Sequence, residues 1–343
     1  MADYPRGVLN RPETHAPTGS ALRGAVRSEA LRVPKPLMER SRWRPAAAIA
    51  TAHLWTVMAL AVGLFMPGGV AAKVVVGFVA ILIGERSLQT LVHHLSHDML
   101  SKDRERNDRL GNLLVAGFVG IRIQNYRRVH FVHHAENGSS ADPEFIDFDT
   151  VDGKGGLRRF VLSYVTGGEV LGLLRKYYGS SQVSPPSAPA ARRSRSPEAT
   201  ATGGRRFVRE VSHIVVCQLV LIAAFVFIAQ AWYLYIVWLY VAVTWSPLLS
   251  KLRFLVEHPG KDDRTVSTLG PWFEVLVFAP FNFNYHWEHH VWPTLPPYRL
   301  DGMHRHLVRE GFFDRYPEFT TSSFIRSLGR RAASSSRAAP SPS

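Results

Sequence analysis

Positions 46–66 of this 343-residue chain form an apolar stretch that contains no Asp, Glu, Lys or Arg. As an α-helix at about 1.5 Å per residue, the stretch is roughly 30 Å long, which matches the hydrocarbon core of a bilayer. Three more apolar stretches follow at 69–92, 211–230 and 232–250, and the connection within each pair is very short. The pattern predicts an all-α integral membrane protein with four transmembrane helices in two antiparallel hairpins.

Basic residues flank one end of each apolar stretch. The chain carries 41 Lys and Arg against 27 Asp and Glu, a formal net charge of +14, without the aromatic-interleaved basic patch that is typical of nucleic-acid binding. We therefore expect a membrane surface, and no nucleic acid, as the partner of these charges. The flanking cations are Arg40, Arg42, Arg44, Lys102, Arg104, Arg106, Arg109, Arg205, Arg206, Arg209, Lys251 and Arg253. By the positive-inside rule they predict that both termini and the segment between the hairpins are cytoplasmic.

The polar segments divide the chain into one membrane domain and two tails. Residues 1–40 lack periodicity and the apolar core of a signal peptide, and 326–343 are similar in composition, so we expect two disordered tails. Residues 41–325 are expected to form the membrane domain, interrupted by a disordered Pro-, Ser- and Arg-rich linker at 179–206. Cys217 is the single cysteine, which excludes an intrachain disulfide or a cysteine-ligated cluster.

Three histidine clusters predict a metal site: HHLSH at 93–97, HFVHH at 130–134 and HWEHH at 286–290. Residues three and four apart share one face of a helix, so each cluster directs its imidazoles toward one point. Eight or nine converging imidazoles exceed the roughly six ligands that one ion accepts, which favours two metal ions. Imidazole alone does not distinguish iron from zinc or copper, and a chance clustering of surface histidines is the alternative.

The predicted topology gives an independent check, because a shared site needs all three clusters on one side of the bilayer. The charge pattern places them together in a cytoplasmic helical cap. His258 lies about as far beyond its apolar stretch as His93 lies beyond the second one. This similar depth nominates His258 as a further ligand.

The three boxes, in this order and placed between and after two hairpins, resemble those of the membrane-bound fatty acid desaturase family, which includes related carotenoid hydroxylases and ketolases. The likeness extends to HHLSHDMLSKDRERNDRLGNLL, YRRVHFVHHAENGSSADPEF and, most specifically, PFNFNYHWEHHVWPTLPPYRLDGMH. Together with RFLVEH and Arg264 it covers roughly residues 45–310. Carried over position by position, the resemblance implies that two iron ions are bound by His93, His97, His130, His133, His134, His258, His286, His289 and His290.

Three positions depart from the family pattern. His94 stands where the first box more often has an acidic residue, and it is expected to be a second-sphere partner or a competitor of His93 for the metal. Phe254 stands where the animal acyl-CoA branch has an Asn that holds a metal-bound water, and His286 stands where front-end desaturases have Gln. Carboxylates beside the boxes are expected to orient the imidazole rings, the candidates being Asp98, Asp142, Glu257 and Glu288.

The resemblance implies an O2-dependent desaturase that introduces a double bond into a fatty acyl or other lipid-like substrate with external electrons. A hydroxylase or ketolase of the carotenoid or secondary-metabolite type is the first alternative, because substrate geometry decides the outcome. HPGK at 258–261 is not surrounded by a haem domain, so we expect a separate ferredoxin or cytochrome-type electron donor, attracted by a basic cytoplasmic face. A non-oxygenase metalloprotein, such as a transporter or zinc hydrolase, is disfavoured because the boxes lie beyond the spans and HExxH is absent.

Overall fold

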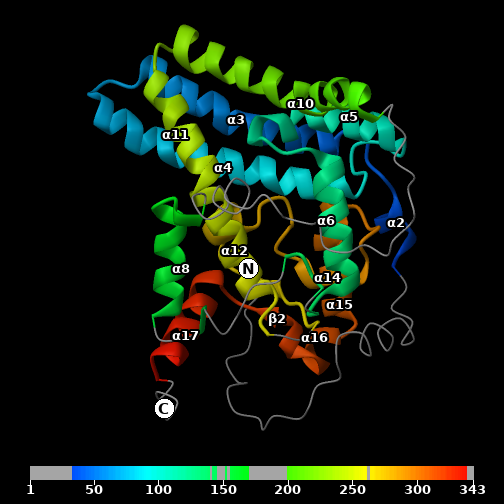
Figure 1. The fold of residues 1–343 in the computed structure, drawn as a ribbon. Coiled ribbons are helices and arrows are strands. Elements are labelled where there is room, and N and C mark those ends of the chain that lie inside the picture. The colour runs from blue at the N-terminus through cyan, green and yellow to red at the C-terminus, as the bar shows by residue number, and fades with distance from the viewer. Residues whose placement is uncertain are drawn as a thin grey trace.

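The computed structural model describes residues 33–139, 141–144, 151–152, 155–169, 199–260 and 263–337. Most of the predicted tail at 1–40 and of the predicted linker at 179–206 lies outside these residues. Almost all the described elements are helices, and one short parallel pairing joins β1 (Ser267–Thr268) to β2 (Thr320–Thr321). Figure 1 shows an upper layer of long helices and a lower layer of shorter ones.

The upper layer begins with two long helices, α3 (Arg44–Phe65) and α4 (Val70–Ser96), which pack side by side (Figure 1). The turn between them contains Gly68 at a φ of 112°, which a residue without a Cβ accepts readily. A Cβ added at Gly84 of α4 would lie 3.2 Å from the Cβ of Trp55 on α3. Small residues at the contact therefore let the two backbones approach closely.

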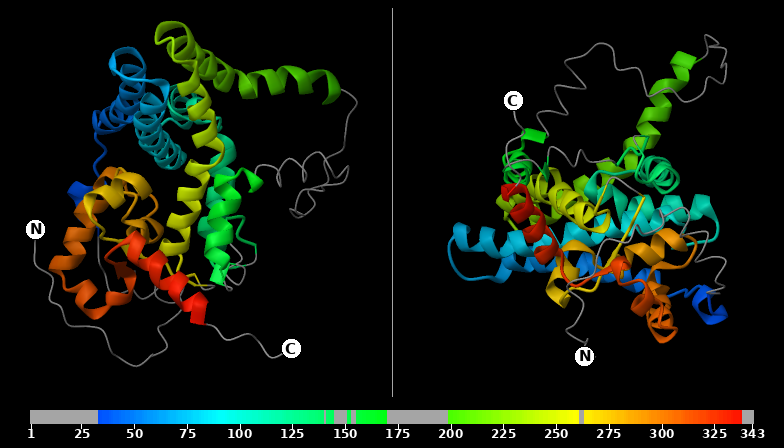
Figure 2. Two further views of the ribbon diagram at one scale, coloured as in Figure 1. Left: turned by 90° about the vertical axis from the view of Figure 1, so that its left-hand side faces the viewer. Right: turned by 90° about the horizontal axis from the view of Figure 1, so that it is seen from below.

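The third and fourth predicted spans are arranged differently from the first two. α10 (Ala199–Ile222) continues through a π-helical segment, η2 (Ala223–Ile228), at the top of the molecule. α11 (Trp232–Val243) then turns away and packs along α4 rather than along α10 (Figures 1 and 2). After a break at Thr244, α12 (Trp245–Glu257) carries the chain down into the lower layer.

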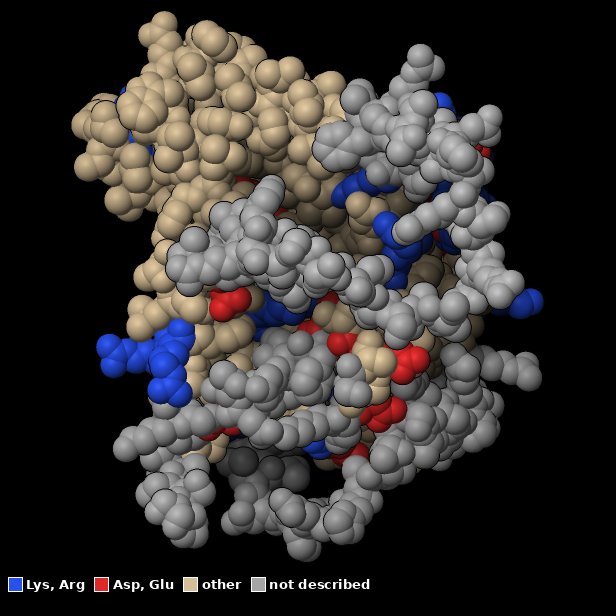
Figure 3. Space-filling model, viewed as in Figure 1, with Lys and Arg blue, Asp and Glu red and all other residues tan. Residues whose placement is uncertain are grey.

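Three helical segments among the described residues are long and apolar enough to cross a membrane: Arg44–Phe65, Val211–Ile228 and Trp232–Glu257. The predicted span at 69–92 coincides with α4, which carries Lys73, Glu85 and Arg86 and is not in this set. Among the residues that Figure 3 colours, the face over α11 and the segment Val211–Ile228 is almost free of charged side chains, whereas Lys, Arg, Asp and Glu appear over the lower layer. The upper layer is therefore the part of the molecule that suits a bilayer.

The lower layer consists of short elements that surround the C-terminal ends of α4 and α12 (Figure 2). They are α2 (Lys35–Met38), α6 (Ile123–Glu136), α8 (Gly156–Val165), α13 (Trp272–Phe278), α14 (His286–Val291), η3 (Pro297–Arg299), α15 (Leu300–Arg309), α16 (Phe312–Arg315), η4 (Pro317–Phe319) and α17 (Phe324–Arg337), with α5 (Arg104–Leu114) and η1 (Ala116–Val119) leading back to the upper layer. Trp287 of α14 is buried in an aromatic cluster with Phe312, Phe313 and Phe319. This cluster fixes α14 against α16 and the segment that follows it.

α17 corrects the prediction that residues 326–343 form a disordered tail, because Phe324–Arg337 is helical. Phe324 is fully buried and stacks on Phe278 with ring centroids 5.0 Å apart. Glu274 accepts a hydrogen bond from the backbone N–H of Phe324 at 2.6 Å, which satisfies one of the free donors at the start of the helix. Residues 199–206 of the predicted linker likewise belong to α10. Because both segments are rich in polar residues, the sequence did not predict that they are helical.

Candidate metal centre

The first histidine cluster lies at the C-terminal end of α4. His93 lies in the last turn of the helix and His97 caps it. The chain then turns at Asp98, which has a φ of 57° and accepts hydrogen bonds from Arg127 at 2.9 Å and from Arg104 at 3.3 Å. These charge-assisted contacts hold the turn that follows the cluster.

The second cluster lies on α6, which a buried arginine joins to α4. Arg127 donates to the carbonyl oxygen of Ser96 at 2.7 Å and forms a bidentate ion pair with Asp108 at 2.8 and 2.6 Å. Bidentate pairing fixes the guanidinium in orientation as well as in position. The helix consequently brings its histidines to the end of α4, and these histidines are His130, His133 and His134.

His258 and the third cluster complete the set. His258, which its depth along the chain nominated as a ligand, caps the C-terminal end of α12. α14 places its histidines at positions i, i+3 and i+4, which share one face of a helix: His286, His289 and His290. Trp287 points into the aromatic cluster, and its backbone N–H donates to Ser267 Oγ at 3.0 Å. Burial of Trp287 thereby orients the histidine face.

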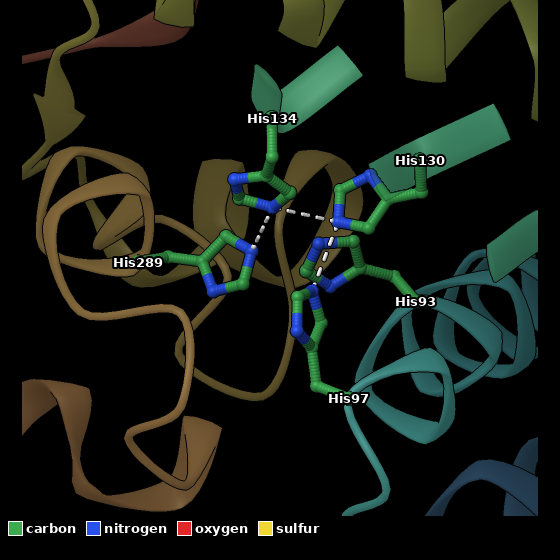
Figure 4. Close-up of side chains that lie close together, drawn as sticks. All are labelled: His93, His97, His130, His134 and His289. Carbon is green, nitrogen blue, oxygen red and sulfur yellow. Dashed lines mark hydrogen bonds between the residues drawn. The ribbon is translucent and has the colours of Figure 1, made fainter. Parts of the chain in front are cut away.

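The nine histidines implied as ligands form two compact groups. The first group comprises His93, His97, His130, His134 and His289 (Figure 4). The second group comprises His133, His258, His286 and His290. Within each group, one ring nitrogen of each residue lies within 4.8 Å of those of all the others. The groups adjoin each other, since the ring centroids of His134 and His290 are 4.3 Å apart.

The nitrogens of the first group face one another in a way that hydrogen bonds alone cannot satisfy. His130 Nε2 lies 3.0 Å from His97 Nε2 and 2.9 Å from His134 Nε2, which is also 3.1 Å from His289 Nε2 (Figure 4). A ring nitrogen offers one in-plane direction, for a proton or for a lone pair, so these contacts cannot all be hydrogen bonds. Nitrogens bound at about 2.1 Å to one metal ion are separated by about 3 Å at right angles. The donor set therefore fits a metal ion.

The second group contains one close pair of ring nitrogens and further ring nitrogens that are buried without a partner. His258 Nε2 and His286 Nε2 are 2.9 Å apart. Both ring nitrogens of His290 are buried without a hydrogen-bond partner, as are both ring nitrogens of His93 in the first group. Each buried polar atom left unpaired costs about 1–3 kcal/mol. Metal coordination would satisfy these nitrogens.

Burial favours the neutral form of most of these imidazoles. Desolvation is the largest cause of a lowered pKa at His134, His286, His289 and His290, and repulsion from neighbouring imidazoles lowers the pKa of each further. At His130 the pKa is also lowered by burial, and the carboxylate of Glu144 partly counteracts this effect. Neutral imidazole is the form that binds a metal ion.

Carboxylates lie beside the Nδ1 atoms of three of these histidines. Asp142 Oδ2 forms a hydrogen bond with His133 Nδ1 at 2.8 Å, whereas Glu257 Oε2 lies 3.3 Å from His286 Nδ1 without forming one. A carboxylate that accepts a hydrogen bond from Nδ1–H fixes the tautomer whose Nε2 lone pair is available to a metal ion. Asp142 and Glu257 were both expected in this role from their positions beside the boxes.

Glu144 is the third carboxylate and was not among the sequence candidates. Its Oε1 lies 3.8 Å from His130 Nδ1. Burial alone would raise the pKa of Glu144, but the contacts with His130, His133 and Lys251 outweigh this effect and lower it. The sequence signal that could have indicated Glu144 is its position two residues after Asp142.

The remaining second-sphere candidates have other partners. Asp98 holds the turn after α4, as described above. Glu288 was expected to contact one of the nine histidines. Its described hydrogen bonds instead join it to Ser267 Oγ and, at 2.5 Å, to His304 Nδ1. His94 belongs to neither group, is buried, and lies with its ring centroid 5.5 Å from that of His93.

Comparison with known families identifies the family of this chain. The family model described as "Fatty acid desaturase" matches residues 72–323, which include all nine histidines. This chain belongs to the fatty acid desaturase family. A search among curated proteins found no match. Membership of this family implies that the protein is an oxidoreductase of the desaturase and hydroxylase type. Its apolar helices are consistent with a membrane protein.

The aromatic ring of Phe254 lies beside the second histidine group. The Phe254 ring stacks on His258 with centroids 4.2 Å apart and also faces His133 at 5.7 Å. An apolar ring therefore occupies the position at which the animal acyl-CoA branch has an Asn. The Phe254 side chain packs against His258 and offers no oxygen to hold a water molecule.

Proposed function

We propose that this protein is an O2-dependent di-iron desaturase, with one iron ion held by the first histidine group and one by the second. The observation that carries the proposal is the meeting of five and four imidazoles in two adjoining groups. Their unpaired, buried ring nitrogens and mutual spacing of about 3 Å support a pair of metal ions rather than a structural cluster of histidines.

The proposed reaction removes two hydrogen atoms from adjacent carbon atoms of a fatty acyl or other lipid-like substrate. In balanced form, R–CH2–CH2–R′, O2, two electrons and two protons give R–CH=CH–R′ and two water molecules. Bound iron would supply the redox chemistry with O2 that amino-acid side chains lack. The protein supplies neutral imidazoles as ligands, Asp142 orients the ring of His133 through a hydrogen bond to Nδ1, and Glu144 and Glu257 place carboxylates beside Nδ1 of His130 and His286.

We place all four apolar segments, α4 included, in the bilayer, with both termini and the metal centre on the cytoplasmic side. The charges of α4 are compatible with this placement because they do not face lipid. Glu85 and Arg86 are 0% and 2% exposed, and Arg86 donates to Ser250 Oγ at 2.6 Å. Lys73 lies near one end of the helix, where its ammonium donates to the carbonyl oxygen of Gly63 at 2.9 Å.

A separate ferredoxin or cytochrome-type protein is proposed to deliver the electrons. The support is a basic face on the lower layer, where exposed arginines lie on α8 and on α17, two helices that contact each other. These arginines are Arg158, Arg159, Arg326 and Arg330. A face of this charge would attract an acidic donor and increase its rate of association.

The test is metal and product analysis of the full chain produced in a heterologous host. We expect about two irons per chain and an O2-dependent product that has lost two hydrogen atoms. A product that has instead gained one oxygen atom would identify a hydroxylase on the same scaffold. About one zinc per chain without iron would overturn the oxygenase assignment.

A further inference from the structure

Two aromatic side chains at the start of α13 are exposed, although this helix packs against both α4 and α12. Trp272 is 77% exposed and Phe273 is 48% exposed. The one charged residue of α13, Glu274, is buried, and its carboxylate accepts hydrogen bonds from Ser323 Oγ at 2.8 Å and from the backbone N–H of Phe324 at 2.6 Å. The exposed face of α13 therefore carries no charge.

A third exposed apolar side chain lies beside these two. Ile325 of α17 is 54% exposed, and its backbone N–H lies 3.4 Å from the same Glu274 carboxylate. Single apolar residues are common on protein surfaces, whereas a group of large ones marks contact with lipid or with another protein. We call Trp272, Phe273 and Ile325 the α13 patch.

The depth of α13 along α4 indicates what covers this patch. Arg86 of α4 donates from Nη2 to the carbonyl oxygen of Phe278, the last residue of α13, at 2.8 Å. From Val70, at the start of α4, to Arg86 is about 24 Å of helix at about 1.5 Å per residue. The hydrocarbon core of a bilayer is about 30 Å thick. In the proposed placement of α4, Phe278 therefore lies inside the core, and tilting of α4 would place it deeper.

The span formed by α11 and α12 gives the same depth. Ser250 of α12 accepts a hydrogen bond from the same Arg86 guanidinium at 2.6 Å. Ser250 is at most about 27 Å of helix from Trp232, at the start of α11. Trp272 is separated from Phe278 by about 9 Å of helix. Trp272 consequently lies no further out than the lipid headgroups.

We propose that α13 is embedded in the cytoplasmic leaflet and that Trp272 and Phe273 insert among the lipids, as a membrane anchor in addition to the four spans. The inference rests on the placement of α4 under the proposed function. Lipid is the occupant because it already surrounds the protein at this depth. The indole of Trp is apolar with a single N–H donor, and Trp is enriched at the boundary between lipid chains and water.

The anchor has a consequence for the metal centre. The chain leads from α13 to Phe283, whose ring packs against His93 with centroids 4.1 Å apart. His93 belongs to the first histidine group. Insertion of α13 would thus hold the first group at a fixed distance from the cytoplasmic leaflet.

The experiment measures the depth of nitroxide labels on the full chain in vesicles of phosphatidylcholine and phosphatidylglycerol. Cys217, the only cysteine, is replaced by Ser, and Trp272→Cys and Phe273→Cys are labelled separately. Power-saturation electron paramagnetic resonance compares collisions of each label with O2, which concentrates among lipid chains, and with a water-soluble nickel chelate. We expect both labels to collide more with O2 than with the chelate.

Two exposed valines provide matched controls: Val79→Cys on α4 for lipid and Val308→Cys on α15 for water. Labels at Trp272 and Phe273 that resemble the label at Val308 would overturn the anchor. Few collisions with either reagent would also overturn it, because another part of the protein or a second copy would then cover the patch.

The control at Val79 separates this inference from the proposed placement. A label at Val79 that meets the chelate would refute the placement of α4, and the anchor with it. A lipid-exposed label at Val79 together with a water-exposed label at Trp272 would refute the anchor alone. Neither result depends on iron content or turnover, so a failure of the proposed reaction leaves the anchor standing.

A second measurement keeps the native side chain in the wild-type protein. Lipids brominated on their acyl chains quench the fluorescence of tryptophans that they contact, so Trp272→Phe is expected to remove part of the quenchable emission. Trp292→Phe in the lower layer is the control and should leave the quenchable emission unchanged. Equal quenchable emission from the wild type and the Trp272 variant would contradict insertion of this residue.

Discussion

Asp142 Oδ2 lies 2.8 Å from Nδ1 of His133, and both side chains are 1% exposed. Asp142 is itself held in place, because its Oδ1 accepts a hydrogen bond from the backbone N–H of Glu144 at 2.8 Å. A buried carboxylate fixed in this way determines which ring nitrogen of His133 carries the proton.

Asp142→Asn is expected to weaken metal binding at the second group by about 10- to 100-fold, because an amide orients the imidazole less strongly than a carboxylate. Competition with a chelator measures the affinity. Asp301→Asn is the control, since the Asp301 ion pair with Arg305 is on the exposed side of α15. Unchanged affinity in the Asp142 variant would show that the contact with His133 does not orient a ligand.

His133→Ala and His289→Ala are expected to abolish turnover while the protein still inserts into the membrane. The two residues belong to different groups, so each variant should lose metal mainly from its own group. Iron analysis and a membrane-extraction assay provide the measurements. His306→Ala, on α15 and outside both groups, serves as the control. Substantial activity in either cluster variant would rule out its ligand role.

Glu288→Gln is expected to lower stability without removing metal, because Glu288 bonds to Ser267 and His304 rather than to a histidine of either group. Loss of a charged, buried acceptor should cost about 1–3 kcal/mol. Thermal unfolding and iron content are measured on the same sample. Loss of iron at an unchanged unfolding temperature would mean that Glu288 acts on the metal centre after all.

Acidification is expected to destabilise the metal-free protein. Burial, followed by repulsion from neighbouring imidazoles, lowers the pKa of His286, His289 and His290 well below the ordinary value. Histidines in the unfolded chain titrate near about pH 6.5, so below this pH the unfolded state binds protons that the folded state does not. The stability that neutral histidines contribute is present above about pH 6.5 and is lost below it, by about 1.4 kcal/mol per pH unit for each excess proton.

Unfolding of the metal-free protein in detergent, followed from about pH 8 to about pH 5, measures this loss. The variant His290→Gln removes one of the responsible groups and should give a shallower dependence on pH. Stability that stays constant or rises as the pH falls through this range would contradict the expectation.

The sequence identified all nine histidines that the structure brings together, but it could not divide them between two groups. His133 and His134 are adjacent in sequence and lie in different groups. Successive residues on a helix point about 100° apart, and only the packing of α6 against its neighbours decides where each ring lies. The same geometry explains Glu288, which stands between histidines in sequence but points away from them on α14.

Apolar periodicity located the long helices but could not predict which of them pack together. Hydropathy records how apolar a segment is and carries no information about its neighbour, so the packing of α11 along α4 was not foreseen. The polar composition of α17 predicted disorder, although Phe324 is buried at the start of this Ser- and Arg-rich segment. A few buried side chains suffice to hold such a helix against the protein.

α4 is one unbroken helix of 27 residues, from the turn at Gly69 to His97. At 1.5 Å per residue its length is about 40 Å, and a helix responds to a thicker or thinner bilayer by tilting rather than stretching. In the proposed placement of α4 in the bilayer, the distance from the turn at Gly69 to the first imidazoles is therefore the same in every lipid environment. Lipids of different length would change only the tilt of α4, and with it the angle at which the two histidine groups face the membrane surface.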